Sequence, residues 1–209
     1  MEKVEYLPRL LLGLVFLAIL LPAWPAFVGE QARDHSLAEK VRGHSDAPVT
    51  MIEYSSLTCP HCMAFHRDTL PKIKKAYIET GKVKLIFRDF PLDSLALAAA
   101  MLARCAAPER HSGMIEMLFR SQEIWSQGNK TLRDLERIVR FGGMSKNDVE
   151  ACLNNETLMK AIQAKAVAGE KEYTISSTPT FIVEGEKMSG NLTFEDFRVV
   201  LDKALAKKQ

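Results

Sequence analysis

Two apolar runs frame a helical stretch early in the chain. Val49 to Tyr54 and Val83 to Phe87 are rich in apolar and β-branched residues, a pattern typical of strands covered on both faces of a sheet. Between them, apolar residues at helical spacing predict one helix from Pro60 to Gly81, kinked at Pro71. The order predicts a right-handed β-α-β unit with the first strand in the centre of the sheet.

Helical patterns then replace the strands. Segment 92–172 contains no convincing strand, and its periodicity predicts helices at about 94–107, 114–127, 131–141, 145 onward and 156–172. Residues 178–183 and 187–189 predict a hairpin, and an amphipathic helix follows Thr193. We therefore predict an α/β domain made of 49–91 and 173–207, interrupted by a helical insertion at 92–172.

An uncharged stretch precedes this domain. Leu10 to Gly29 carries no charge, and its aliphatic first part has the length of a signal-peptide core. The whole run also reaches the roughly 20 residues that span a bilayer. Residues 1–29 predict a cleaved signal peptide or a retained anchor, with a buried core helix as the remaining alternative, and 30–48 predicts a linker. Either of the first two places the domain in an oxidising compartment.

Composition narrows the class of protein. A hydrophobic content of 47% and a charged content of 26% are ordinary for a globular domain. Lys and Arg number 28 against 26 Asp and Glu, so the net charge of +2 provides no electrostatic footprint for nucleic acid or an anionic membrane surface. We expect no nucleic-acid partner, and membrane contact only through the N-terminal segment.

Cys59 and Cys62 stand two residues apart where the first strand runs into the helix, with Pro60 at the first helical position. A helix N-terminus stabilises a thiolate, so the pKa of Cys59 should fall, and a protonated His61 would add to the effect. Cys62, one turn later, can attack a mixed disulfide on Cys59. The spacing predicts a redox pair that needs no cofactor.

Zinc binding is the main alternative for this motif. Cys59, Cys62 and His66 have plausible ligand spacing, but Cys105 and Cys152 do not belong to a second C-x-x-C that would complete the site. A permanent disulfide in so small a loop would constrain little unfolded-state entropy. We therefore predict no metal.

The stretch Glu53 to Cys62, the helical insertion and the segment Ser177 to Thr180 together resemble the DsbA-like family of exported thiol-disulfide oxidoreductases. The resemblance covers about residues 46–206. It implies a thioredoxin fold with an inserted all-helical domain, the first cysteine as nucleophile and the second as resolving thiol. It also implies a cis Pro179 facing the pair, with the Thr178 backbone presented to substrate; a trans proline opening an edge strand is the alternative.

The resemblance bears on three further residues. Glu53 is the only charged residue of the first strand, and the pattern alone leaves a solvated glutamate and a buried acid equally open. In the family that position is a buried carboxylate, which implies a proton acceptor for Cys62. Cys105 and Cys152 lie on insertion helices, and export favours a structural disulfide between them over two free buried thiols.

The resemblance also implies substrates and partners. These are thiols of exported proteins or peptides, and a membrane quinone-linked re-oxidase similar to DsbB, with the protein a monomer in the periplasm or tethered to the inner membrane. Thr178 differs from the aliphatic residue of the strongest oxidases and occurs in isomerase and reductase relatives. Because no dimerisation domain precedes the fold, we predict an oxidase. The alternatives are an isomerase or reductase of the same fold, or a holdase or zinc-binding module without turnover.

Overall fold

The structure is a computed structural model that describes Met1, residues 35–127 and residues 131–208. The predicted signal peptide or anchor at 1–29 lies outside the described residues except for Met1, as does the predicted linker up to residue 34. In the part that is described, no helix combines the length and the apolar character needed to cross a membrane.

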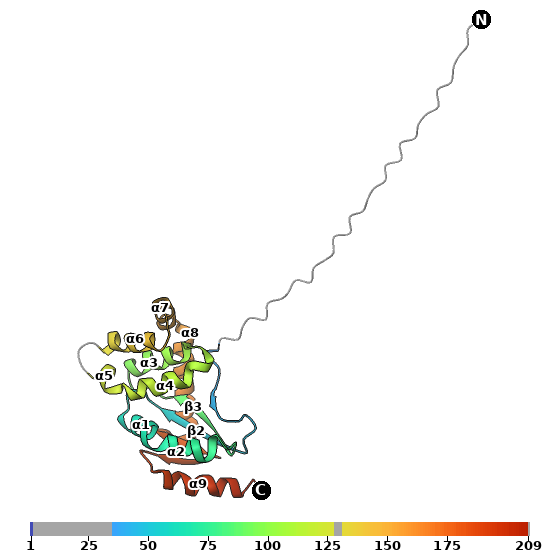
Figure 1. Cartoon of the computed structure of the whole chain (residues 1–209), viewed down its shortest axis with the longest axis vertical. Helices are drawn as coiled ribbons and strands as arrows, with labels where there is room; N and C mark the ends of the chain where they lie inside the picture. Colours follow the sequence, from blue (N-terminus) through green and yellow to red (C-terminus); the bar gives the residue numbers. More distant parts are fainter. Residues whose placement is uncertain (2–34, 128–130, 209) are drawn as a thin grey trace. The chain divides into compact units, whose positions relative to one another are not determined.

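A five-stranded mixed sheet organises the fold, with strand order β1-β3-β2-β4-β5 (Figure 1). β2 and β3 run parallel, while the pairs β1 with β3, β2 with β4 and β4 with β5 are antiparallel. β2 is therefore the central strand, as its apolar pattern predicts. The strands are β1 (Lys40–Arg42), β2 (Val49–Ser55), β3 (Val83–Asp89), β4 (Thr180–Val183) and β5 (Glu186–Ser189).

β1 corrects the linker prediction for part of segment 30–48. Its three residues pair with β3, with Lys40 opposite Phe87 and Arg42 opposite Leu85. A short, charged strand is suited to a sheet edge, because only one of its sides joins the hydrogen-bond ladder. The apolar run on which the strand predictions depend is missing here, so the sequence pattern did not reveal it.

The helical run after β2 is interrupted rather than regular. It consists of α1 (Pro60–Ala64), the π-helical turn η1 (Phe65–Thr69), α2 (Leu70–Ile73) and a second π-helical turn, η2 (Lys74–Ile78). Pro71 has no N–H to donate to the Arg67 carbonyl and its ring crowds that group, so the chain widens into a π turn ahead of it. The disturbance predicted at Pro71 is thus a change of helix type.

The insertion is helical between β3 and β4 throughout the described residues. One predicted helix, 114–127, is two helices that meet at Ser121, and α7 begins at the predicted cap, Ser145, in a reciprocal capping box with Asp148. A disulfide joins Cys105 to Cys152, with Cα atoms 6.1 Å apart. The elements are α3 (Ser94–Cys105), η3 (Pro108–Arg110), α4 (His111–Arg120), α5 (Gln122–Ser126), α6 (Thr131–Phe141), α7 (Lys146–Leu153) and α8 (Glu156–Tyr173).

The central strand presents its two faces to different layers. Met51 packs with Phe181 and with Phe197 of α9 (Phe194–Ala206), whereas Tyr54 on the other face packs with Ile175. α8 approaches closely at Gly169, where a Cβ would clash with the Tyr54 ring. In Figure 1 the insertion helices α3, α4, α6 and α7 gather at one end and α9 lies at the other.

Candidate active site

The redox turn is held by side chains of the insertion. Cys59 is the N-cap of α1, in extended conformation, and Pro60 follows it at the first helical position. Gln122 of α5 is buried and donates from Nε2 to the carbonyls of Leu57 (2.8 Å) and Cys59 (3.0 Å). Asp93, which precedes α3, accepts a 2.7 Å hydrogen bond from the Thr58 hydroxyl. The insertion therefore fixes the position of the thiol pair.

The two thiols of the pair differ in acidity. Cys59 is 7% exposed and Cys62 is 0% exposed, and neither is bonded to another cysteine. A hydrogen bond from the Cys62 thiol is the largest influence that lowers the pKa of Cys59, to about 5, and the N–H groups of Cys62 and His61 add to it against the effect of burial. Burial raises the pKa of Cys62, and its hydrogen bond to Cys59 raises it further. Near neutral pH the pair is a Cys59 thiolate beside a Cys62 thiol.

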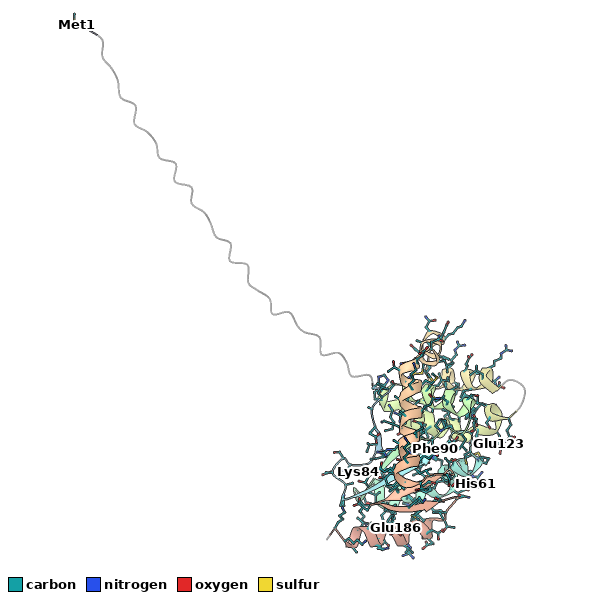
Figure 2. The ribbon with its side chains drawn as sticks, turned by 180° about the vertical axis from the view of Figure 1, so that it is seen from behind. Met1, His61, Lys84, Phe90, Glu123 and Glu186 are labelled. Carbon is teal, nitrogen blue, oxygen red and sulfur yellow. A yellow bond between two sulfur atoms is a disulfide. The ribbon has the colours of Figure 1, made fainter. Side chains whose placement is uncertain are left out.

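The side chains of Pro60 and His61 are exposed next to this buried pair, and His61 is labelled in Figure 2. The sequence suggested that the imidazole of His61 would stabilise the thiolate. In the structure it is the backbone N–H of His61 that contributes to the low pKa of Cys59.

The segment before β4 closes the other side of the site. The bond between Thr178 and Pro179 is cis, and both residues are buried. The carbonyl oxygen of Thr178 lies 3.3 Å from Cys59 Sγ, and the hydroxyl of Thr178 lies near enough to contribute to the lowered pKa of Cys59. A backbone segment thus borders the reactive sulfur at hydrogen-bond distance.

Glu53 is buried in β2, with 0% of its surface exposed, so it is not a solvated glutamate. Its Oε1 is hydrogen-bonded at 2.9 Å to Nε2 of His66, whose side chain is 4% exposed. Among the described residues, Glu53 Oε2 and His66 Nδ1 have no hydrogen-bond partner. The buried acid therefore has one polar contact, and that contact is a titratable base.

Strand and helix periodicity place Glu53 close to the resolving thiol. Glu53 and Ser55 point to the same face of β2 because they are two residues apart. The Ser55 hydroxyl has no hydrogen-bond partner among the described residues but lies near enough to Cys62 to oppose the rise in its pKa. Glu53 hydrogen-bonds His66, which follows Cys62 by one helical turn. Glu53 accordingly lies beneath the turn that joins Cys62 to His66.

Three residues of this site were missed or misassigned by the sequence reasoning. Asp93 could have been found, since it precedes a predicted helix and caps it by accepting the Ala96 N–H at 2.7 Å. His66 was considered only as a zinc ligand. Gln122 gave no signal, because its contacts depend on how α5 packs against the turn.

The zinc alternative is not supported by the side-chain arrangement. Within residues 35–127 and 131–208, no group of three or more His, Cys, Asp and Glu side chains could hold a metal ion. The imidazole that the zinc spacing requires, His66, is instead hydrogen-bonded to Glu53.

A thiol pair at a helix N-terminus, a mixed five-stranded sheet and helices inserted between β3 and β4 define a thioredoxin-like fold with a helical insertion. A family model described as Thioredoxin matches residues 35–203. The chain belongs to the thioredoxin family, and its similarity to solved DsbA structures places it among the DsbA-like members. The predicted fold class and the family resemblance are confirmed.

Solved structures and sequence relatives agree on this placement. Alpha-DsbA1 of Wolbachia pipientis is 34% identical, with a TM-score of 0.76 over 81% of this chain and 92% of that one. BdbD of Bacillus subtilis is 25% identical, with a TM-score of 0.72 over 80% and 93% of the two chains.

A Rickettsia conorii protein inferred to be a protein-disulfide oxidoreductase is 31% identical over 172 residues, which are 82% of this chain and 62% of that protein. The chain thus spans less than two thirds of this relative. Disulfide bond formation protein D of Bacillus subtilis is 27% identical over 175 residues, which are 81% of this chain and 78% of that protein.

Proposed function

We propose that the protein is a thiol-disulfide oxidoreductase that introduces disulfides into exported proteins by exchange through Cys59 and Cys62. The opposite pKa shifts of the two thiols support this proposal. The pKa of Cys59 is lowered to about 5, whereas burial raises the pKa of Cys62. A thiolate of low pKa is a good leaving group, and its stability favours the reduced form of the pair. The oxidised pair is then an oxidant of client thiols.

The exchange has two steps. A client thiolate attacks Cys59 Sγ, the bond between Cys59 and Cys62 breaks, and Cys62 leaves with the electron pair and takes a proton from Glu53. A second client thiolate attacks the client sulfur, and Cys59 leaves as a thiolate. Two electrons pass from the client to the pair, and the client gains a disulfide. The Thr178 backbone beside Cys59 supports docking of an extended client segment.

Partners and location follow from this chemistry. The reduced pair must return its two electrons, and we propose a membrane quinone-linked protein similar to DsbB as the acceptor. Exported clients place the reaction in the periplasm, with the protein a monomer that is either released or tethered by its N-terminal segment. The named role of the Bacillus subtilis relative in disulfide bond formation supports an oxidase.

Thr178 favours a second candidate, an isomerase or reductase of the same fold. Its hydroxyl helps to set the pKa of Cys59, at a position where the strongest oxidases carry an aliphatic side chain. The reduction potential separates the two candidates. Equilibration of the pair with glutathione should give a potential nearer about −120 mV than about −270 mV for an oxidase, the values typical of DsbA and thioredoxin.

Replacement of the entry thiol tests the proposal. The full chain with Cys59→Ser should no longer oxidise a reduced peptide that contains two cysteines. The double variant Cys105→Ala, Cys152→Ala is the matched control, because it removes a disulfide that lies outside the site, and it should retain activity once its folding is verified. Full activity of Cys59→Ser would refute the proposal.

A further inference from the structure

Two histidine rings lie close to Phe87, and they have different surroundings. The His66 and His111 rings lie with centroids 6.0 Å and 6.2 Å from that of Phe87. The His66 side chain is 4% exposed and His111 is 5% exposed. Only His66 is hydrogen-bonded to a carboxylate, at 2.9 Å from Glu53. Burial lowers the pKa of His111 to about 3, so His111 remains neutral at physiological pH.

His66 also borders two spaces that lead away from Glu53. One is a surface groove of about 470 Å³ between the helical run that starts with α1 and helices α4 and α5, with Phe119 in its wall and Glu123, labelled in Figure 2, at its edge. The other is a cavity of about 10 Å³, close to the smallest volume that holds one water molecule, lined by both histidines and Ser112. The ring thus lies between a buried acid and solvent-accessible space.

We propose that His66 is the positioning residue through which Glu53 exchanges protons with solvent during turnover of the thiol pair. The inference rests on the proposed function and extends it. Glu53 Oε2 has no partner among the described residues, so His66 provides the one polar route out of this buried site. An imidazole can accept a proton at one nitrogen and release it from the other, which a permanently charged side chain cannot do.

One proton moves and no electrons are transferred in this relay. When the reduced pair is re-oxidised, the Cys62 thiol gives its proton to the Glu53 carboxylate, and the resulting acid donates to Nε2 of His66. Nδ1 then releases a proton to water in the adjoining cavity or groove. When a client thiolate expels Cys62 from the disulfide, the proton travels in the opposite direction and Cys62 becomes a thiol.

Charged groups of both signs surround His66, whose Nε2 is hydrogen-bonded to the Glu53 carboxylate at 2.9 Å. Its two adjoining spaces are lined by five basic and two acidic side chains besides the neutral His111. These groups are Lys40 and Arg42 of β1, Arg67 and Lys74 of the helical run after β2, Glu116 and Arg120 of α4, and Glu123 of α5.

Single-turnover oxidation of the reduced full chain by oxidised glutathione tests the relay, because it separates a step that does not need the Cys62 proton to leave from one that does. In the first step the Cys59 thiolate attacks glutathione disulfide; in the second, Cys62 loses its proton and attacks the mixed disulfide on Cys59. We expect His66→Gln and His66→Ala to leave the first step unchanged and to slow the second by about tenfold or more, with an altered pH profile. Imidazole added to His66→Ala should restore the second step, because the groove reaches the vacated position.

His111→Ala is the matched control, since it removes an imidazole of similar burial that also borders Phe87. It should keep the wild-type second step and show no response to imidazole, with folding of each variant verified by thermal unfolding. Wild-type rates in His66→Gln at every pH, or no imidazole rescue of His66→Ala, would overturn the relay. Equal loss of both steps in a folded His66→Gln would also overturn it, because that result indicates a structural role. Loss of the first step in Cys59→Ser tests the proposed function separately.

Discussion

Glu53 and Asp89 are two carboxylates buried in neighbouring strands of one sheet, and their partners differ. Glu53 of β2 is 0% exposed and is hydrogen-bonded to the titratable His66. Asp89 of β3 is 4% exposed and forms an ion pair with Arg104 of α3. A guanidinium neither gains nor loses a proton in a protein, whereas an imidazole does both near neutral pH. The partner therefore decides whether a buried acid can exchange protons.

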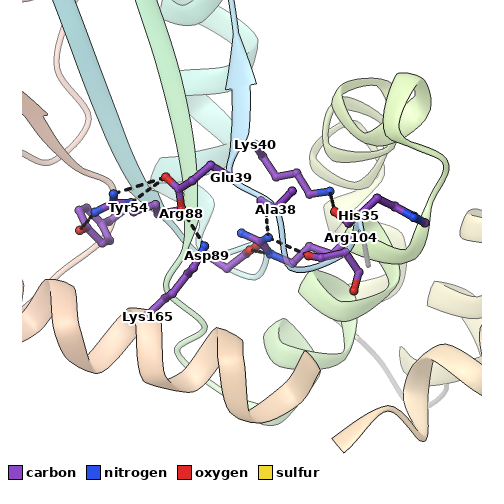
Figure 3. Close-up of polar contacts among 10 residues, drawn as sticks. His35, Ala38, Glu39, Lys40, Tyr54, Arg88, Asp89, Arg104 and Lys165 are labelled. Carbon is purple, nitrogen blue, oxygen red and sulfur yellow. Dashed lines mark hydrogen bonds and ion pairs between the residues drawn. The ribbon is translucent and has the colours of Figure 1, made fainter. Parts of the chain in front are cut away.

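The Asp89 site is structural in the rest of its contacts as well. Arg104 donates from Nη1 to the carbonyls of Ser36 and Ala38, each at 3.0 Å, and so ties segment 36–38 to α3 and β3. Figure 3 shows the contact of Arg104 with Ala38. Burial raises the pKa of Asp89, and the charge and hydrogen bond of Arg104 oppose that effect. No thiol takes part in this cluster. We expect its loss to affect stability and the loss of Glu53 to affect rate.

Replacement of Arg104 should give the largest effect. Arg104→Met keeps the length of the side chain but leaves the Asp89 carboxylate buried without its cation and removes the donors to segment 36–38. Breaking a buried ion pair from one side costs about 3–5 kcal/mol of unfolding free energy. Urea unfolding measures this loss, which should be the same for the oxidised and reduced forms. Arg104→Met, Asp89→Leu should recover part of it, because it removes both charges.

If Arg104→Met lost less than about 1 kcal/mol of unfolding free energy, the Asp89–Arg104 ion pair would contribute no more than an exposed ion pair does. Asp89 would then not differ from Glu53 by a structural role. A change in the potential of Cys59 and Cys62 in this variant would show that the Asp89 cluster affects the redox site. We expect the potential to stay constant.

Glu53→Gln should produce the complementary result. The amide keeps the size of the side chain and a hydrogen bond with His66 but cannot accept the Cys62 proton. Removing a general acid-base group typically slows a reaction on the order of 100-fold, so the Cys62-dependent step should slow to that extent, while unfolding free energy changes less than in Arg104→Met. Stopped-flow oxidation and urea unfolding of the same preparation give both numbers. A normal rate with a large stability loss would assign Glu53 a structural role like that of Asp89.

The sequence predicted where Glu53 lies more successfully than what it contacts, and the predicted second strand ended at Phe87, before Asp89. The apolar run around Glu53 predicted a central strand, and Thr193 with Asp196 predicted the start of the last helix, because such patterns are local. The partners are 13 residues away for Glu53 and 15 for Asp89, and they reach the strands only when helices pack on the sheet. No periodicity encodes that contact.

Two errors have the same origin. β1 was assigned to a linker because an edge strand needs no apolar run, and the register with β3 that defines it is a long-range contact. The helix predicted at 114–127 breaks at Ser121, where Gln122 begins α5 and donates to the redox turn. Apolar spacing continued across this break, since both helices contribute to one core. The local sequence pattern therefore predicted most helices and strands, whereas the edge strand β1 and the break at Ser121 depend on tertiary contacts.

The titration of Cys59 tests this contrast on the other thiol, because Glu53 is not among the main influences on the pKa of Cys59. The pKa of Cys59 is lowered from 9.0 to about 5 by Cys62 and by backbone N–H groups. This lowering stabilises the folded reduced form fully above pH 9 and is lost as the pH falls through 5. Thiolate absorbance should therefore titrate near pH 5 in the wild type, and the midpoint should move by less than about one unit in Glu53→Gln. A larger shift would show that Glu53 acts on both thiols.

Glu39 extends the comparison to an exposed acid and predicts the smallest effect. Its carboxylate accepts from Lys165 at 2.8 Å and from Arg88 at 3.4 Å, while Arg88 also donates to the Tyr54 hydroxyl at 2.7 Å (Figure 3). Because water solvates these charges, Glu39→Gln should cost about 1 kcal/mol or less, and the cost should shrink in molar salt. Urea unfolding at low and high salt measures both. If Glu39→Gln lost as much unfolding free energy as Arg104→Met, independently of salt, burial would not be the reason why the Asp89–Arg104 pair contributes more to stability than an exposed ion pair.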